Sequence, residues 1–146
     1  MSQETFVVAY EGATNGSAVL DYAIERARRE GASLLLVHVL EWSPYQFLTP
    51  QELEERHARR TEELRRAEEA IMTPALAKVR EAGVEAEGEI AYGSTVPIVA
   101  EAATKAGATM IFVGRSGANS SLGARIFGST PLGLAQVASV PTVIVP

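Results

Sequence analysis

The sequence predicts an α/β fold with one open, doubly wound, five-stranded parallel sheet that carries helices on both faces. Three observations support this prediction. Five short runs of β-branched and other apolar residues alternate with longer segments of helical periodicity. Several runs are apolar on both faces of a strand, which is typical of strands covered from both sides. The chain has 146 residues, 47% of them hydrophobic, which predicts a single packed domain over residues 1–146.

The predicted strands are residues 6–10, 34–40, 84–92, 110–113 and 142–145. The first two are apolar on both faces, so we expect them in the interior of the sheet. The third alternates and places Glu85, Glu87 and Glu89 on one face, so we expect it nearer an edge.

Four helical segments are predicted between the strands, at about residues 17–30, 50–82, 96–106 and 129–139. The first and third end at Gly31 and Gly107, since glycine is the preferred residue just past a helix C-terminus. Strands that alternate with helices predict parallel pairing with right-handed crossovers.

The second helical segment differs from the others. It opens with a capping box formed by Thr49 and Glu52. Pro74 lies inside it and is expected to kink it or divide it in two. Residues 54–63 offer only Ala58 as an apolar side chain, so we expect this part to be solvated. Projection from the domain, or contact with a partner subunit, is the alternative.

Composition excludes several classes of function. A net charge of −5 argues against nucleic-acid binding as the main task, which needs a concentrated basic surface. The absence of cysteine excludes disulfides, thiolate catalysis and cysteine-ligated metals. No apolar run approaches the ~20 residues that span a bilayer, and no signal peptide is recognisable. We therefore expect a cytoplasmic protein without membrane insertion.

The segment at residues 114–130, after the fourth predicted strand, carries the strongest functional signal. It holds four glycines and five hydroxyl residues between a buried strand and a helix. Glycine allows close backbone approach to a ligand, and the helix that starts near Ser129 and Thr130 offers free N–H groups to an anion. Ligands of open parallel sheets bind beyond the carboxyl ends of the strands. The segment predicts a phosphate cradle; an ordinary glycine-rich connection capped by Ser129 is the alternative.

Other motifs of phosphate chemistry are incomplete. Residues 123–130 are similar to a Walker A loop, but Ser129 stands where that loop requires lysine, so a P-loop NTPase is excluded. Arg115 and Arg125 either neutralise phosphate charge or face solvent.

Catalytic groups are scarce. His38 lies within a predicted strand, where a packed, hydrogen-bonded core histidine is favoured over a catalytic base. His57 is expected to be exposed, and the two histidines show no metal-binding spacing. Trp42 and Tyr45 either cover a base or mediate subunit contacts. No general base is paired with a nucleophile, so we expect a binding protein with no catalytic residues.

The glycine pattern resembles that of the universal stress protein family, in its ATP-binding branch. Gly114-x-x-Gly117 and Gly128-Ser129 match the family's phosphate motif, with ten intervening residues where the family has nine. Residues 7–12, 36–39 and 140–145 extend the resemblance over nearly the whole chain. Glu11 stands where the family usually has aspartate.

The resemblance implies an adenine nucleotide alpha hydrolase-like fold that binds ATP, with AMP and ADP as alternatives, together with Mg²⁺. The nucleotide-binding residues it implies are Ala9, Tyr10, Glu11, Val39, Gly114, Arg115, Ser116, Gly117, Gly128, Ser129 and Thr130. Glu11 and Ser129 are the candidate protein ligands of Mg²⁺. A core position for Tyr10 and a solvated strand end for Glu11 are the alternatives.

The resemblance also implies a homodimer, or a higher oligomer, in which the fifth strand pairs across a two-fold axis and covers an apolar edge. It implies a regulator in the stress response, a nucleotide-dependent switch that acts on an effector or on a membrane transporter. Two other hypotheses remain open. One is a slow Mg²⁺-dependent ATP hydrolase that uses Glu11, and the other is a scaffold of the same fold that binds no nucleotide.

Overall fold

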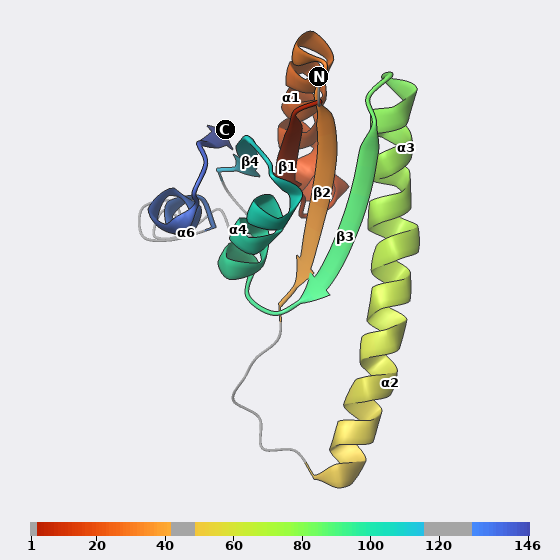
Figure 1. The fold of residues 1–146 in the computed structure, drawn as a ribbon. Coiled ribbons are helices and arrows are strands. Elements are labelled where there is room, and N and C mark those ends of the chain that lie inside the picture. The colour runs from red at the N-terminus through yellow and green to blue at the C-terminus, as the bar shows by residue number, and fades with distance from the viewer. Residues whose placement is uncertain (1–2, 42–48, 116–129) are drawn as a thin grey trace.

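The computed structural model describes residues 3–41, 49–115 and 130–146. Its five strands form one parallel sheet in the order β3-β2-β1-β4-β5 (Figure 1). The strands are β1 Thr5–Ala9, β2 Ser33–Leu40, β3 Ala86–Tyr92, β4 Met110–Gly114 and β5 Thr142–Val145. The predicted five-stranded parallel sheet is confirmed, and so is the edge position of the third strand.

The strand order reverses between β1 and β4. The chain moves outward from β1 through β2 to β3, then crosses to the far side of β1 and continues through β4 to β5. Ala9, the last residue of β1, pairs with Val37 of β2 and with Val113 of β4. The carboxyl ends of these three strands therefore meet at the point where ligands of open α/β sheets bind.

Helices cover both faces of the sheet, as Figure 1 shows. The helical elements are α1 Ala13–Glu30, α2 Pro50–Ala67, a π-helical turn η1 Glu68–Met72, α3 Thr73–Glu81, α4 Thr95–Ala106 and α6 Thr130–Val137. The alternation of side chains along β1 divides the core: Phe6 and Val8 pack with α1 and α3, whereas Val7 and Ala9 pack with α4 and α6. The rings of Phe6 and Phe112 lie 5.5 Å apart in the first core.

α1 begins at Ala13, four residues before the predicted start. Gly12 takes a φ of 105° and turns the chain straight from β1 into the helix. A Cβ at Gly16 would lie 2.9 Å from ring carbons of Tyr10, so glycine lets the first turn of α1 pass directly over that ring. The first turn lacks apolar periodicity, and the sequence pattern therefore missed it.

Pro74 divides the long second helical segment, as predicted. Proline has no N–H, so it cannot donate to the carbonyl four residues earlier. The chain accommodates the break with the π-helical turn, in which the Thr73 N–H reaches back to the carbonyl of Glu68. α3 then starts with Pro74 in its first turn, where no intrahelical donor is required.

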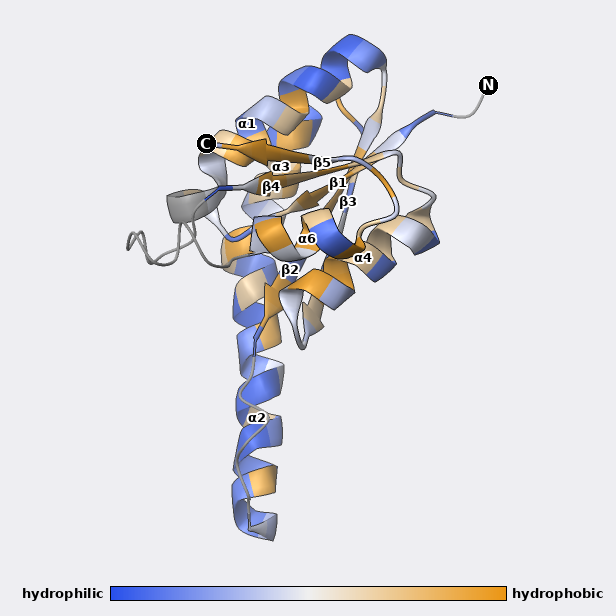
Figure 2. Ribbon diagram, turned by 90° about the vertical axis from the view of Figure 1, so that its left-hand side faces the viewer, coloured by the Kyte–Doolittle hydropathy of each residue, from blue (hydrophilic) through white to orange (hydrophobic). Residues whose placement is uncertain are grey.

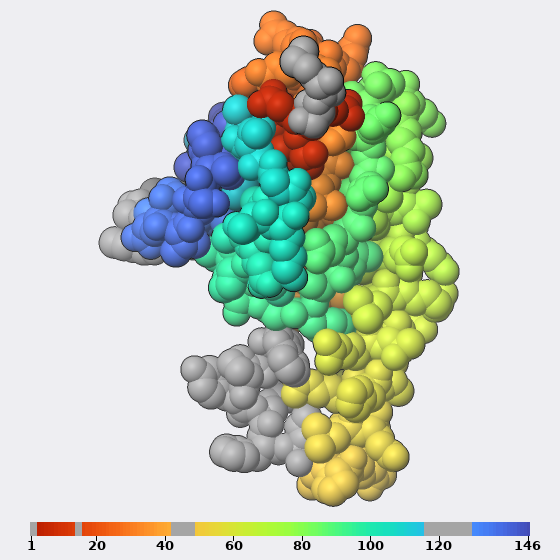
Figure 3. Space-filling view, in the orientation of Figure 1, coloured from red at the N-terminus to blue at the C-terminus, as the bar shows by residue number. Residues whose placement is uncertain are grey.

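The first part of α2 extends past the sheet, and Figure 2 shows it as mostly hydrophilic. Figure 3 shows the same segment reaching beyond the body formed by the sheet, α4 and α6. Its residues between 54 and 63 are exposed or half-buried, which confirms the predicted solvation. Ion pairs such as those from Glu62 to Arg65 and Arg66 run along its surface. Among the described ranges no helix is both long enough and apolar enough to cross a membrane.

Candidate functional site

A pocket of about 460 Å³ lies at the carboxyl ends of β1 and β2. The start of α4, the start of α6 and one residue of α2 complete its wall. Five of the predicted nucleotide-binding residues line it: Ala9, Tyr10, Glu11, Val39 and Thr130. Residues from both halves of the sequence therefore meet at the sheet position where strand order reverses.

The remaining predicted site residues belong to the phosphate segment. Gly114 ends β4, and Arg115 follows it, with its N–H donating to the Val145 carbonyl at 2.8 Å. The Arg115 residue is exposed. The other four members lie outside the described residues: Ser116, Gly117, Gly128 and Ser129. The same holds for Arg125, Trp42 and Tyr45, so the predictions for them are untested.

Thr130 is the C-terminal residue of the predicted phosphate cradle. It is the first residue of α6, a helix of eight residues, and it is half-buried at the pocket wall. The first N–H groups of a helix have no intrahelical acceptor and carry the positive end of the helix dipole. This side of the pocket is therefore suited to an anion.

The backbone of Val39 forms the opposite side. Val37 turns its carbonyl toward β1, where it accepts the N–H of Tyr10 at 2.9 Å. Backbone groups alternate sides along a strand, so Val39 turns its N–H and carbonyl in the same direction, beyond the last paired residue of β1. This neighbouring donor and acceptor can form hydrogen bonds with the edge of a planar heterocycle.

His38 lies behind this wall. It is 7% exposed, and its Nδ1 lies 2.7 Å from the carbonyl oxygen of Tyr10. A carbonyl only accepts, so Nδ1 carries the proton and donates it. The predicted packed, hydrogen-bonded histidine is confirmed, and the residue also lines the pocket. Tyr10 itself belongs to the core between α1 and the sheet, so the predicted core alternative holds for its side chain.

Glu11 lines the pocket two residues after the end of β1. Partial removal from water raises the pKa of its carboxyl group, the neighbouring Glu41 raises that pKa further, and His38 opposes both. Glu11 is exposed and lines the pocket. Its predicted contact with the ligand stays a prediction.

Two further acidic residues line the pocket and were missed by the sequence analysis. Glu41 follows β2, and its carboxylate accepts a hydrogen bond from the Thr95 hydroxyl at 2.7 Å. Glu63 comes from α2 and accepts a hydrogen bond from the Tyr92 hydroxyl. Glu41 could have been found, since it lies two residues after Val39 on the same strand end. No sequence signal marks Glu63, because its position depends on how α2 leans against β3.

Tyr92 connects α2 to this end of the sheet. Its hydroxyl lies 3.3 Å from the Arg60 carbonyl oxygen, and the Arg60 guanidinium lies 4.6 Å above its ring centroid. Burial and the adjacent Glu63 carboxylate raise the pKa of Tyr92 to about 12. The hydroxyl therefore stays protonated and donates to Glu63 at neutral pH.

Metal-binding capacity is limited in the part of the chain that the structure describes. There, no three His, Asp or Glu side chains come close enough together to hold a metal ion. Glu11 offers one carboxylate at the pocket, and the other candidate ligand, Ser129, lies outside the described ranges. Magnesium in nucleotide sites is held by one or two carboxylates and by phosphate oxygens, so a single carboxylate fits a metal that arrives with its nucleotide.

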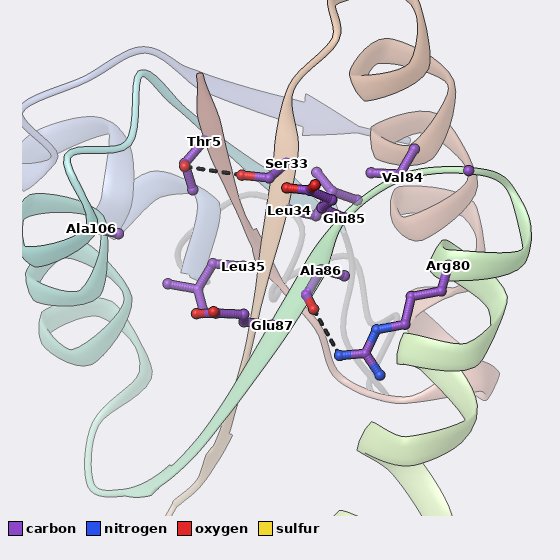
Figure 4. Close-up of a pocket in the computed structure, with 11 residues that line it drawn as sticks. Thr5, Ser33, Leu34, Leu35, Arg80, Val84, Glu85, Ala86, Glu87 and Ala106 are labelled. Atoms are coloured by element: carbon purple, nitrogen blue, oxygen red, sulfur yellow. Dashed lines mark hydrogen bonds between the residues drawn. The ribbon is translucent and has the colours of Figure 1, made fainter. Parts of the chain in front are cut away.

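A larger pocket, of about 790 Å³, lies at the opposite ends of the strands (Figure 4). Three of its polar side chains, those of Thr5, Ser33 and Arg80, already have partners within the protein. The hydroxyls of Thr5 and Ser33 are hydrogen-bonded to each other at 3.1 Å, and Arg80 donates to the Ala86 carbonyl at 2.8 Å. It lies at the amino ends of the strands, away from the switch point and the phosphate segment. The smaller pocket is therefore the candidate functional site.

Comparison with known proteins gives one consistent answer. The universal stress protein UspA from Lactobacillus plantarum has a TM-score of 0.83 and 19% sequence identity, with 100% of each chain covered. A universal stress protein in complex with cAMP gives 0.71 and 23%, with 99% of this chain and 98% of that chain covered. The universal stress protein from Archaeoglobus fulgidus in complex with dAMP gives 0.63 and 19%, with the same coverage. At these identities, the likeness establishes the fold.

No curated protein sequence matched the chain. The sequence profile described as the universal stress protein family matches residues 3–146, almost the full length of the chain. The chain therefore belongs to the universal stress protein family.

Proposed function

We propose that the protein binds an adenine nucleotide, ATP in the first place, in the pocket at the carboxyl ends of β1 and β2. The observation that carries this proposal is the meeting of Ala9, Glu11, Val39 and Thr130 around one pocket at the switch point of the sheet. Two structures of similar fold carry cAMP and dAMP, which supports an adenine nucleotide as the ligand class.

The pocket suggests how the nucleotide lies. The backbone N–H and carbonyl of Val39 suit the edge of adenine, and the Glu11 carboxylate suits the ribose hydroxyls. The phosphates then point toward Thr130 and Gly114, where the N-terminus of α6 favours an anion. In the proposal, Arg115, Ser116, Gly117, Gly128 and Ser129 complete the cradle. Glu11 or Ser129 would hold Mg²⁺, which would offset part of the phosphate charge.

We further propose that the protein works as a nucleotide-dependent switch in the cytoplasm and not as a turnover enzyme. A ligand shifts a protein between states only by its different affinity for them. The partner proposed is a stress-response effector or a membrane transporter, on the basis of family membership alone. ADP and AMP remain alternative ligands, and a scaffold that binds no nucleotide is the outcome if all three fail to bind.

A homodimer through β5 is part of the proposal. β5 is an edge strand, and its Ile144 side chain is 45% exposed. Leu132 and Val137 on the adjacent α6 are 47% and 58% exposed. An apolar edge strand is a template for pairing, and pairing with a second copy across a two-fold axis would cover it.

The experiment that tests nucleotide binding starts with the purified protein. Acid extraction followed by chromatography identifies any adenine nucleotide that copurifies. Calorimetric titration of the nucleotide-free protein with Mg-ATP then measures the affinity. Saturable heat and a raised melting temperature are expected. The absence of both, with ADP and AMP equally silent, contradicts the proposal.

A slow Mg²⁺-dependent hydrolase is the second candidate, and the raised pKa of Glu11 favours it because a general base benefits from a pKa moved toward neutrality. Steady phosphate release that Glu11→Gln abolishes, while ATP still binds, would support it. No release above the buffer control over several hours would reject it.

A further inference from the structure

We propose that Glu41 and Glu63 are specificity-determining residues of the candidate pocket. They select adenine nucleotides whose phosphates all extend from the ribose 5′ oxygen, and they exclude nucleotides with a second phosphate on the 2′ or 3′ oxygen. The inference rests on the proposed nucleotide function and concerns the two acidic residues that no sequence motif had marked.

Acidic side chains and backbone N–H groups lie on different sides of the pocket. Glu63 approaches from α2 beside β3, Glu41 follows β2, and Glu11 lies two residues after β1, so three carboxylates line one side. The next strand is β4, and on that side Thr130 lines the pocket at the start of α6, whose first N–H groups have no intrahelical acceptor. Neighbouring strands are about 4.8 Å apart, so the end of β2 and the end of β4 are separated by roughly 10 Å, close to the length of a nucleoside phosphate.

The carboxylates of Glu41 and Glu63 are each held in place by a neutral hydroxyl group. Thr95 donates its hydroxyl to Glu41 at 2.7 Å, and Tyr92 donates its hydroxyl to Glu63. A neutral hydroxyl fixes the position of a carboxylate but leaves its charge. Among the described residues that line the pocket there is no lysine or arginine; Arg60 lies over the Tyr92 ring and is not part of the lining.

Glu11, Glu41 and Glu63 line the same side of the pocket, and like charges repel each other. A phosphate placed there would meet repulsion from these carboxylates. Ribose hydroxyls and the adenine amino group are hydrogen-bond donors, and they find acceptors there instead.

This arrangement of charges therefore makes the affinity of a nucleotide depend on the position of its phosphates. A 5′-phosphate chain extends toward α6 and leaves the donors of the nucleoside on the acidic side. A nucleotide with phosphates at both ends of the ribose cannot avoid the carboxylates in either orientation. Repulsion of this kind builds specificity against a competitor without adding affinity for the preferred ligand.

The test compares ADP with adenosine 3′,5′-bisphosphate, two compounds of identical composition whose second phosphate sits at different ends. Calorimetric titration measures both dissociation constants for the wild type, Glu41→Gln, Glu63→Gln and the double variant. Glutamine keeps an oxygen that accepts from Thr95 or Tyr92 and removes the charge. Glu54→Gln, on the exposed part of α2 and outside the pocket lining, is the matched control.

The wild type and the control are expected to prefer ADP by at least about tenfold, the size of a single close charge repulsion at a protein surface. The double variant should lose most of that preference, through tighter binding of the bisphosphate, while its circular dichroism and melting temperature stay near wild type. Equal affinities of the wild type for the two compounds would overturn this inference and leave the proposed function standing. The same holds for an unchanged affinity ratio in the folded double variant. If neither compound nor ATP binds the wild type, the proposed function itself fails, and this inference falls with it.

Discussion

The Nδ1 of His38 donates a hydrogen bond of 2.7 Å to the carbonyl oxygen of Tyr10, and this bond ties the end of β1 to β2 at the wall of the pocket. Tyr10 is the last residue before Glu11, and His38 is the last before Val39. The bond therefore sets the relative position of the carboxylate and the backbone groups to which the proposal assigns ribose and adenine.

Replacement of His38 by alanine is expected to destabilise the fold by about 1–3 kcal/mol, because a buried carbonyl loses its donor. It should also weaken ATP binding, since the ends of β1 and β2 lose their fixed spacing. Urea denaturation and calorimetry measure the two effects. His57→Ala, on the exposed part of α2, is the control and should change neither. A His38→Ala protein as stable as the wild type would show that this hydrogen bond does not contribute to stability.

Glu11 predicts a pH dependence of stability with a defined sign. Its pKa is raised in the folded state, so the folded protein holds this proton more tightly than the unfolded chain. Stability must then fall as pH rises from the ordinary glutamate pKa to above the folded value. Glu11→Gln removes this loss, so the variant should gain stability relative to the wild type as pH rises through that window.

Melting temperatures of Glu11→Gln and wild type, compared between about pH 4 and about pH 7, test this prediction. The difference should be smallest at the acidic end and largest at the neutral end. Glu54→Gln, which is exposed on α2, should show no such trend. A difference that grows toward acid pH would contradict the assigned sign.

Features of this structure that depend on local interactions could be predicted from the sequence. Features that depend on contacts between distant parts of the chain could not. The strands follow from local β-branched runs, and Gly31 and Gly107 both adopt the left-handed conformation that ends a helix, with φ of 67° and 64°. Pro74 acts through its own missing N–H. The start of α1 escaped prediction because it depends on the turn at Gly12 and on the approach of Gly16 to the Tyr10 ring.

The candidate site divides in the same way. Ala9, Glu11 and Val39 were predicted from the family resemblance, and they line one pocket because the strand ends of a parallel sheet meet at one edge. Glu63 could not, since its place at the pocket requires α2 to lean on Tyr92, a contact between residues 29 positions apart. Ser129 and the middle of the phosphate segment lie outside the described residues, so those predictions stay predictions.

Tyr92→Phe is expected to loosen α2 without unfolding the protein. The variant keeps the ring under Arg60 and loses the hydroxyl that bonds Glu63, at a cost of about 0.5–1.5 kcal/mol. Backbone amides of α2 near residues 60–64 should exchange with solvent faster, while those of β1 stay protected. Hydrogen exchange measured by mass spectrometry tests this. Unchanged exchange in α2 would show that other contacts hold the helix.

The proposed dimer interface can be separated from the projecting helix. Ile144→Lys places a charge on the exposed edge of β5 and should convert a dimer to monomers. Leu53 is similarly exposed, at 47%, but lies at the far end of α2, so Leu53→Lys should leave the dimer intact. Sedimentation equilibrium measures both. Dissociation by Leu53→Lys alone would move the interface to α2, the alternative that the sequence left open.

The central claim is that an adenine nucleotide occupies the pocket at the carboxyl ends of β1 and β2, and mapping backbone amide NMR shifts during titration with Mg-ATP tests it most directly. The account predicts saturable shifts at Glu11, Val39 and Thr130. Amides around the opposite pocket, at Thr5 and Ser33, should stay unchanged. Shifts confined to that opposite pocket, or no shifts at millimolar Mg-ATP, would contradict it.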